Sequence, residues 1–170
     1  PQEGGFYGII DVKNLNRNGN RVEKAQFDYS GDSLIMTDTS GNLLLVHIKK
    51  NRFISLAKGI NATALQFLDK NMIFFAIANS QRKVDIYNSQ GNKIESLEGH
   101  KTAVFRIECN FLKELFFSVS KDQLILWDLK TFTKIKALTP KHANTIVEAF
   151  FSKDAQGLTT VFNDSTAYEW

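Results

Sequence analysis

The 170-residue chain contains one cysteine, Cys109, so no disulfide bond can form within it. Because stable disulfides belong to oxidising compartments, a lone cysteine favours a reducing compartment and a cytoplasmic protein. Long apolar runs are also missing: the longest extends from Met72 to Ala78, far short of the roughly 20 residues that a membrane helix needs. The sequence therefore predicts no membrane insertion, and that run suits a strand buried on both faces.

Charge of one sign is scarce as well. The 21 lysines and arginines exceed the 18 aspartates and glutamates by only three. The longest basic cluster, Lys49-Lys50-Asn51-Arg52, falls where we expect a solvated turn. The charge balance therefore gives little support to a nucleic-acid partner.

The usual marks of catalytic and cofactor sites are absent from the sequence. Three histidines and one cysteine stand at spacings that match no zinc pattern. Phosphate binding requires a glycine-rich loop that opens a helix, and we find neither that loop nor a convincing amphipathic helix. We therefore predict no catalytic residue, no metal and no cofactor within these residues.

What the chain does contain is a series of short β-branched and aromatic runs, separated by turns such as Ser40-Gly41-Asn42. Such runs predict strands throughout. In each of four stretches, two apolar runs meet at a polar turn. The four stretches end at spacings of 41, 40 and 43 residues, on Val46, Tyr87, Trp127 and Trp170. This period indicates four copies of one structural unit.

The third and fourth copies also share a set of polar and aromatic positions. The spacing from Asp122 to Trp127 is five residues, whereas the spacing from Asp164 to Trp170 is six, so we expect a distorted arrangement in the third copy. In order along the chain, the matching residues are His100, Ser118, Asp122 and Trp127, followed at offsets of 42, 42, 42 and 43 residues by His142, Thr160, Asp164 and Trp170.

The first and second copies keep the strands and turns but lose this set. Val46 and Tyr87 stand where the later copies have tryptophan. The pair Gly59-Ile60 keeps the glycine of Gly99-His100 and lacks its histidine. Buried polar groups stabilise a fold only when every member has a partner, so the set is expected to be kept or lost as a unit.

The copies resemble WD repeats, each of which forms one four-stranded blade of a β-propeller. The resemblance implies an all-β fold, a propeller fragment of about four blades. The rings of this family typically have seven blades, so we expect further blades in the same polypeptide. Residues 1–24 differ from the repeats, and 6–12 are our candidate for a ring-closing strand. The expected blades lie at about 22–57, 60–98, 100–139 and 142–170.

The resemblance also implies a role for the shared set. In WD repeats a histidine on the loop that enters the blade bonds the turn aspartate and a strand serine or threonine, which in turn bonds the indole N–H. His100, Ser118 and Asp122 also have the residue types of a serine-hydrolase triad. The recurrence of the set one blade later, and the lack of a Gly-x-Ser-x-Gly turn, argue for a structural network instead.

Three segments, 27–42, 99–107 and 126–132, are similar to the N-terminal propeller of TBC-domain-containing WD-repeat proteins associated with centriolar satellites and ciliary bases. In those relatives the TBC domain lies far C-terminal to the repeats. TBC domains commonly accelerate GTP hydrolysis by Rab proteins with an arginine and a glutamine from separate motifs, and neither motif occurs in this chain. The resemblance implies a non-catalytic scaffold that recruits other proteins at the centrosome, basal body or cilium.

Two alternatives stand beside the scaffold. One is the targeting module of a Rab GTPase-activating protein whose TBC domain lies outside this chain. The other is a binder of acidic polymers, either tubulin tails or nucleic acid, through lysines such as Lys49, Lys50, Lys101 and Lys121.

For a scaffold, the candidate partner site is the rim where the loops entering the blades meet the turns between second and third strands. Four of its expected residues are basic, which favours an acidic partner surface, although a solvated lysine fringe is the plainer interpretation. The expected members are Arg82, Lys83, Lys101, Thr102, Lys121 and Asn144.

Overall fold

The structure is a computed structural model that describes residues 20–50, 52–140, 144–152, 154 and 156–170. Two of the sequence predictions, the ring-closing strand at 6–12 and the position of His142, lie outside the described residues. The described residues form fifteen strands and no helix, and therefore no helix that could span a membrane.

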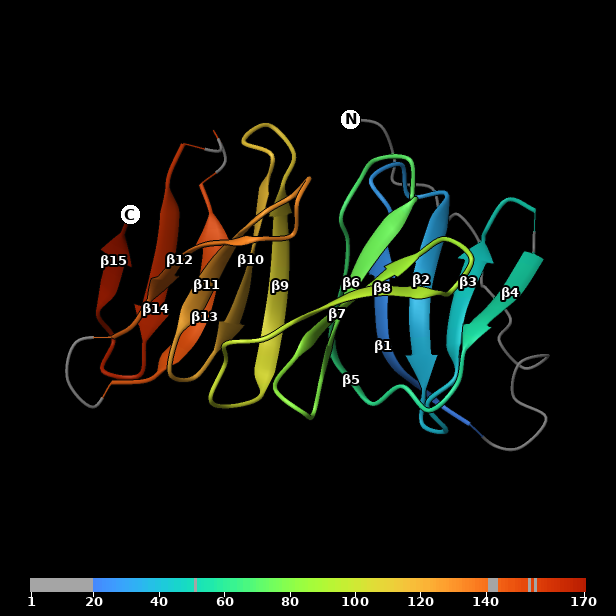
Figure 1. Ribbon diagram of the computed structural model, residues 1–170, viewed down its shortest axis with the longest axis horizontal. Helices are drawn as coiled ribbons and strands as arrows, with labels where there is room; N and C mark the ends of the chain where they lie inside the picture. Colours follow the sequence, from blue (N-terminus) through green and yellow to red (C-terminus); the bar gives the residue numbers. More distant parts are fainter. Residues whose placement is uncertain (1–19, 51, 141–143, 153, 155) are drawn as a thin grey trace, which may run out of the picture.

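The strands form four antiparallel sheets in which neighbours in sequence are neighbours in space (Figure 1). The first sheet contains β1 (Val22–Phe27), β2 (Ser33–Asp38), β3 (Leu43–His47) and β4 (Arg52–Ala57). The second contains β5 (Ala62–Phe67), β6 (Phe74–Asn79), β7 (Val84–Asn88) and β8 (Lys93–Leu97). The third contains β9 (Val104–Asn110), β10 (Leu115–Ser120), β11 (Leu124–Asp128) and β12 (Lys134–Leu138). The fourth contains β13 (Ile146–Phe151), β14 (Leu158–Phe162) and β15 (Ala167–Glu169).

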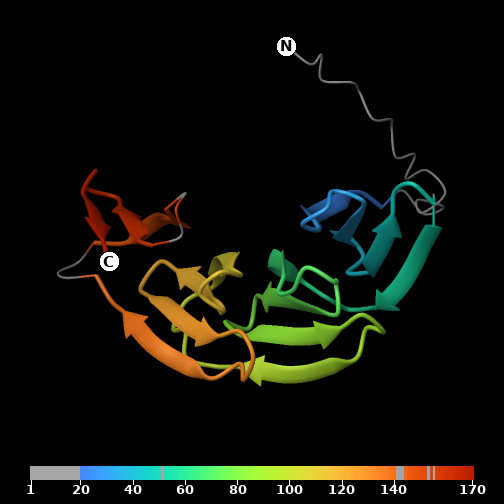
Figure 2. The ribbon, with the colours of Figure 1, turned by 90° about the horizontal axis from the view of Figure 1, so that it is seen from above.

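The four sheets follow one another along an arc, with β4, β8 and β12 on its outer side (Figure 2). The first strands of the first three sheets contact one another, since β5 packs against both β1 and β9. The predicted all-β fold, a propeller fragment of about four blades, is confirmed, and each sheet is called a blade below.

The hydrophobic core lies between successive blades. One cluster joins Ile35 of the first blade to Phe75 of the second, and another joins Ile86 of the second to Phe116 of the third. A third cluster packs Phe117 against the fourth blade. The second strands of the first three blades therefore bury both faces, and all six residues of β2 are buried. The apolar run expected from Met72 contributes β6, which begins at Phe74.

Each blade carries an irregularity at the same place, between its first and second strands. The register of the first strand shifts by one residue against the second strand, which leaves an extra residue there. A bulge of this kind bends the strand and increases its twist. The extra residues recur at the repeat period, at Glu23, Thr63, Phe105 and Val147.

Candidate functional site

A polar network in the third blade centres on His100, which is 8% exposed. Its Nε2 lies 2.6 Å from Oγ of Ser118, and its Nδ1 lies 2.8 Å from Oγ of Ser120. Trp127 donates its indole N–H to Oγ of Ser118 at 2.8 Å. Ser120 is 2.9 Å from a carboxylate oxygen of Asp122. The network thus ties the loop entering the blade to β10, to β11 and to the turn between them.

The end members of this chain of bonds are consistent with one arrangement of the protons. An indole only donates and a carboxylate only accepts. A serine hydroxyl can accept twice and donate once. When Ser118 accepts from Trp127 and gives its own hydrogen to Nε2 of His100, Nδ1 carries the imidazole proton and donates it to Ser120. The ring is neutral in this arrangement. Burial has the same effect, since it lowers the pKa of His100 to about 4 against the opposing charge of Asp122.

The network differs from the prediction in one contact. His100 was expected to bond Asp122 directly, but Ser120 stands between them. Asp122 also accepts a hydrogen bond of 2.5 Å from Thr102 on the entering loop. Although burial opposes the shift, hydrogen bonds from Thr102 and Ser120 hold the pKa of Asp122 below its ordinary value. This altered contact accompanies the short spacing from Asp122 to Trp127 that led us to expect a distorted network.

The same geometry argues against a catalytic triad. The Ser118 side chain is 0% exposed, and its oxygen already accepts from Trp127 and bonds His100. No substrate carbonyl can approach an oxygen that is enclosed in this way. The set therefore acts as a structural tie within the blade.

The fourth blade repeats the tryptophan contact. Trp127 pairs with Phe116, two residues before Ser118. In the same way, the backbone of Trp170 exchanges two hydrogen bonds with Leu158, two residues before Thr160. The indole N–H of Trp170 donates to Thr160 at 3.0 Å. The two tryptophans thus hold equivalent positions, although Trp127 is 3% exposed and Trp170 is 48% exposed.

A contact between the entering loop and the turn recurs at the same 42-residue offset. Asn144 donates its side-chain N–H to Asp164 at 2.5 Å, as Thr102 does to Asp122. In the third and fourth blades a short polar side chain on the entering loop thus holds the aspartate of the turn between the second and third strands.

The first two blades lack the histidine, serine and tryptophan of this network, although in the first blade Asn20, just before β1, still bonds Asp38 and Ser40 at the turn between β2 and β3. The strand register places Met36 and Ile77 at the position of Ser118, because each lies two residues beyond the partner of Val46 or Tyr87. All four residues are buried. The ring of Tyr87 stacks on Phe75 at a centroid distance of 5.8 Å. Apolar packing thus takes the place of the contact between serine and tryptophan in these two blades.

The structure brings part of the predicted partner rim together. Arg82 donates a guanidinium N–H to the backbone carbonyl of Lys101 at 3.1 Å, which joins the second blade to the third. The carbonyl of Lys121 accepts from the backbone N–H of Ile146, at the start of the next blade. Thr102 and Asn144 point their side chains at turn aspartates. The side chains of Arg82, Thr102 and Asn144 are therefore already engaged in contacts within the fold.

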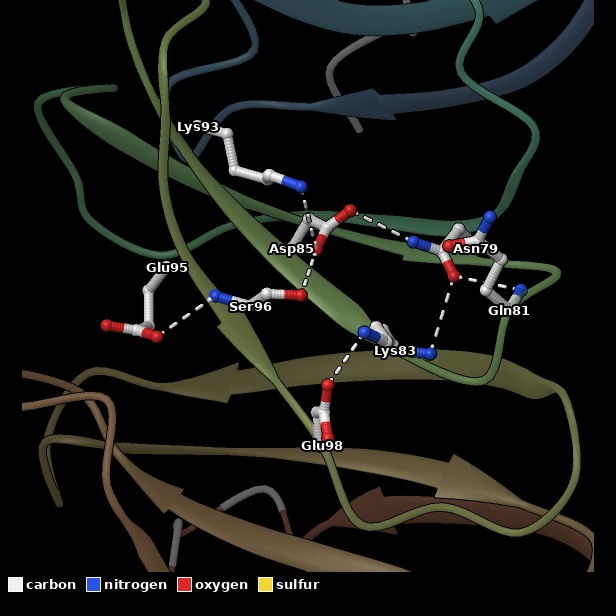
Figure 3. Close-up of polar contacts among 8 residues, drawn as sticks. All are labelled: Asn79, Gln81, Lys83, Asp85, Lys93, Glu95, Ser96 and Glu98. Carbon is white, nitrogen blue, oxygen red and sulfur yellow. Dashed lines mark hydrogen bonds and ion pairs between the residues drawn. The ribbon is translucent and has the colours of Figure 1, made fainter.

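Acidic groups make this rim less positive than its lysines suggested. Lys83 forms an ion pair of 2.7 Å with Glu98 (Figure 3), and that hydrogen-bonded contact raises the pKa of Lys83 and lowers that of Glu98. Asp122 and Asp164 stand on the same rim. The rim predicted from the sequence left out Asp122 and Asp164, which lie in its own turns, and Glu98, which lies just before the loop that enters the third blade.

The opposite face presents an exposed apolar cluster that the sequence analysis did not identify. It comprises Tyr29, Lys70, Phe111 and Leu112, which lie in the loops between the first and second strands of three successive blades. The Lys70 ammonium lies 4.7 Å from the ring centroid of Tyr29 and 5.9 Å from that of Phe111, and the two rings meet edge to face at 6.1 Å. Tyr29 is 71% exposed, and the neighbouring Leu112 is 79% exposed. We call these four residues the aromatic-lysine cluster.

Two other features that could support chemistry are the Cys109 thiol and groups of possible metal ligands. Burial raises the pKa of the Cys109 thiol to about 12, with smaller contributions from the charges of Asp69 and Glu108, so the nucleophilic thiolate is suppressed. Among the described residues, no group of three or more histidine, cysteine, aspartate or glutamate side chains could hold a metal ion.

No protein-family model matches the chain. The chain is 26% identical over 163 residues to TBC1 domain family member 31 of Xenopus laevis, which covers 95% of this chain and 15% of that protein. Identity to the protein of that name from Xenopus tropicalis is 29% over 152 residues, and to the one from Homo sapiens 27% over 152 residues. Each of these two matches covers 88% of this chain and 14% of the relative. The chain thus spans about one seventh of these relatives, and the matches fit the resemblance to TBC-domain proteins noted in the sequence.

Proposed function

We propose that this chain is a non-catalytic protein-interaction module, part of a propeller that recruits partners for a larger polypeptide. The single observation that carries the proposal is the aromatic-lysine cluster. Large apolar side chains that gather on one exposed face are typical of surfaces that bind other proteins. The similarity to TBC1 domain family member 31 supports a larger polypeptide that also carries a TBC domain.

The chemistry of the cluster indicates what kind of partner it fits. Tyr29, Phe111 and Leu112 offer apolar contact area, and aromatic anchors of this type dominate binding energy in many interfaces. Lys70 lies over both rings and presents one positive charge among them. An apolar segment with an acidic residue beside it matches both features.

Two further parts of the proposal concern place and enzymatic context. We propose that the polypeptide acts in the cytoplasm, at the centrosome, basal body or cilium, because the sequence resembles proteins of those structures. We also propose that the module directs a TBC domain, located outside these residues, to its site of action. In that arrangement the propeller would change where Rab GTP hydrolysis occurs and leave its rate unchanged.

The acidic-polymer alternative receives less support from the structure. Of the lysines named for this alternative, Lys49 forms an ion pair of 2.7 Å with Asp32. A surface that binds polyanions presents unpaired lysines along a stripe, and Lys49 does not meet that description.

The test uses the full-length polypeptide with Tyr29 and Leu112 both changed to serine. We expect this variant to lose its focus at the centrosome or ciliary base, as measured by fluorescence microscopy of the tagged protein. The matched control changes Ile94 and Ile135, which are exposed apolar residues on the outer strands β8 and β12, to serine. A third variant, with Lys101 and Lys121 changed to glutamate, reports on the rim predicted from the sequence.

Each result has a clear meaning. Loss of focus in the first variant alone supports the aromatic-lysine cluster as the recruiting surface. Loss in the third variant alone moves the surface to the rim. Normal focus in all three variants, or a wild-type protein with no focus at these structures, contradicts the proposal as stated.

A further inference from the structure

The second blade contains a pocket at a place that a histidine side chain fills in the third blade. The pocket has a volume of about 230 Å³ and lies between the entering loop at Gly59, Ile60 and Asn61, the end of β6, and β7. The loop that carries Gly99-His100 in the third blade carries Gly59-Ile60 here. The histidine that fills this space in the third blade is therefore missing.

Register confirms that the pocket occupies the place of the histidine. In the third blade His100 contacts Ser118 and Ser120. Their counterparts in the second blade, by strand pairing, are Ile77 and Asn79. Both of these counterparts line the pocket, and so does Tyr87, the counterpart of Trp127.

A buried carboxylate has been placed beside this space. Asp85 stands at the position of Ile125, since these two residues pair with Ile77 and Ser118 respectively. Asp85 is 9% exposed and lines the pocket. One carboxylate oxygen accepts from Asn79 at 2.9 Å and the other accepts from Ser96 at 2.6 Å (Figure 3). Both donors are neutral, and each oxygen keeps room for a second hydrogen bond.

Lys93, which forms an ion pair with Asp85, does not donate a hydrogen bond to this carboxylate. Lys93 holds its ammonium 3.9 Å from a carboxylate oxygen of Asp85, which is beyond hydrogen-bond distance. The Lys93 side chain is 52% exposed, so it can leave this position at little cost. A buried carboxylate with neutral donors and a distant, exposed ammonium calls for a closer cation.

We propose that this pocket binds the guanidinium group of an arginine side chain from a protein partner, with Asp85 as its counter-ion. The guanidinium is planar and offers several N–H donors in a fork that matches a carboxylate, and it is less strongly hydrated than an ammonium group. These properties suit a narrow pocket that removes water from the ligand. Burial, together with the charge of Asp85, raises the pKa of Tyr87, so this residue lines the pocket as a neutral phenol.

Lys93 is the internal competitor for this site. An incoming guanidinium takes the position nearest the carboxylate, and the ammonium of Lys93 moves outward into solvent. Removal of Asp85 and removal of Lys93 therefore act in opposite directions on binding, whereas a purely structural role for Asp85 gives neither effect.

The inference deepens the proposed function, since the arginine belongs to a protein partner, but its test needs no partner. Nα-acetyl-arginine methylamide is titrated against the complete polypeptide, and binding is followed by ligand-observed NMR. The matched control ligand is the citrulline derivative, which has the same shape and no charge. We expect Asp85→Asn to weaken binding of the arginine derivative at least about tenfold, as when a buried charge pair loses one partner. We expect Lys93→Ala to strengthen it by up to about fivefold, as for release of an exposed ion pair.

A third variant guards against misfolding of Asp85→Asn. Ser80 is exposed and lines the pocket. The substitution Ser80→Trp leaves Asp85 in place but should cover the pocket and abolish binding as well. Equal binding of the arginine and citrulline derivatives, or no binding of either, overturns the proposal. Equal binding of the corresponding lysine derivative overturns the assignment of a guanidinium. Because none of these measurements depends on the aromatic-lysine cluster, the pocket can fail while the interaction module stands, and the reverse.

Discussion

Nε2 of His100 lies 2.6 Å from Oγ of Ser118, although the two residues are 18 positions apart and stand on different segments of the blade. Ser118 accepts from Trp127, and Nε2 of His100 lies within reach of the hydroxyl hydrogen of Ser118, an arrangement in which Nε2 carries no proton. The fold therefore stabilises the neutral form of one histidine, and that preference makes its stability depend on pH.

The first prediction concerns this pH dependence. The pKa of His100 is about 4 in the folded state against an ordinary value of 6.5, so between these values the unfolded chain binds more protons than the folded chain. The free energy of unfolding should then fall as the pH is lowered from about 6.5 to about 4, by about 3 kcal/mol from this residue. Urea titrations at several pH values measure it.

The matched variant for this prediction is His100→Gln. It removes the titrating group while the other histidines and all carboxylates remain, so its stability should change less with pH over the same window. Aspartates with lowered pKa values, such as Asp28 and Asp38, lose most of their contribution below the lower end of this window, and they do so in both proteins, so the difference between the two curves reports on the histidine. Parallel pH curves for wild type and His100→Gln would show that the histidine is not held neutral.

The second prediction separates the two tryptophans. Trp127→Phe removes the indole N–H from a buried network and should cost roughly 1–3 kcal/mol. Trp170→Phe removes the equivalent bond to Thr160 at a position that is 48% exposed, where water can replace the donor, so the loss should be smaller. Urea midpoints of both variants measure the difference, and equal losses would contradict the role of burial.

The third prediction concerns the approach of two blades. Gly91 has φ +83°, and a Cβ atom there would overlap the backbone of Leu56 in the preceding blade. Gly31 has φ +75° and open space around it, so it is the matched control for backbone conformation alone. Gly31→Ala should cost about 1 kcal/mol, and Gly91→Ala about 2–4 kcal/mol because overpacking is added. Equal urea midpoints for the two variants would rule out the close contact.

The fourth prediction concerns Cys109. Its partial burial and raised pKa suppress the thiolate, so the folded chain should react with iodoacetamide at least about tenfold more slowly than the chain unfolded in urea. Mass spectrometry of timed samples gives both rates. Similar rates in the two states would mean that the thiol is neither buried nor held protonated.

The sequence could predict the repeats because their causes are local. Turn residues such as Gly41 and apolar runs such as Leu43–His47 specify hairpins within a single unit, and the period then carries the pattern along the chain. For the same reason the equivalence of Trp127 and Trp170 follows from spacing. The contact through Ser120 could not be predicted, because the position of a side chain within a turn depends on packing around it.

Contacts between blades could not be predicted from the sequence, for a physical reason. Tyr29 and Phe111 are far apart in the chain, and their meeting with Lys70 depends on how three blades pack. The acidic partner of Lys83 likewise comes from Glu98, on a segment that the turn pattern does not include.

The sequence by itself determined the strand-forming units, their number and their similarity to one another, since alternation and turn chemistry act over a few residues. Only the tertiary structure decided which side chains remain available to a partner. It paired rim residues with acids, exposed the aromatic-lysine cluster, and left a pocket beside Asp85 where the third blade has a histidine. Availability depends on packing between segments about forty residues apart, and no local pattern encodes that packing.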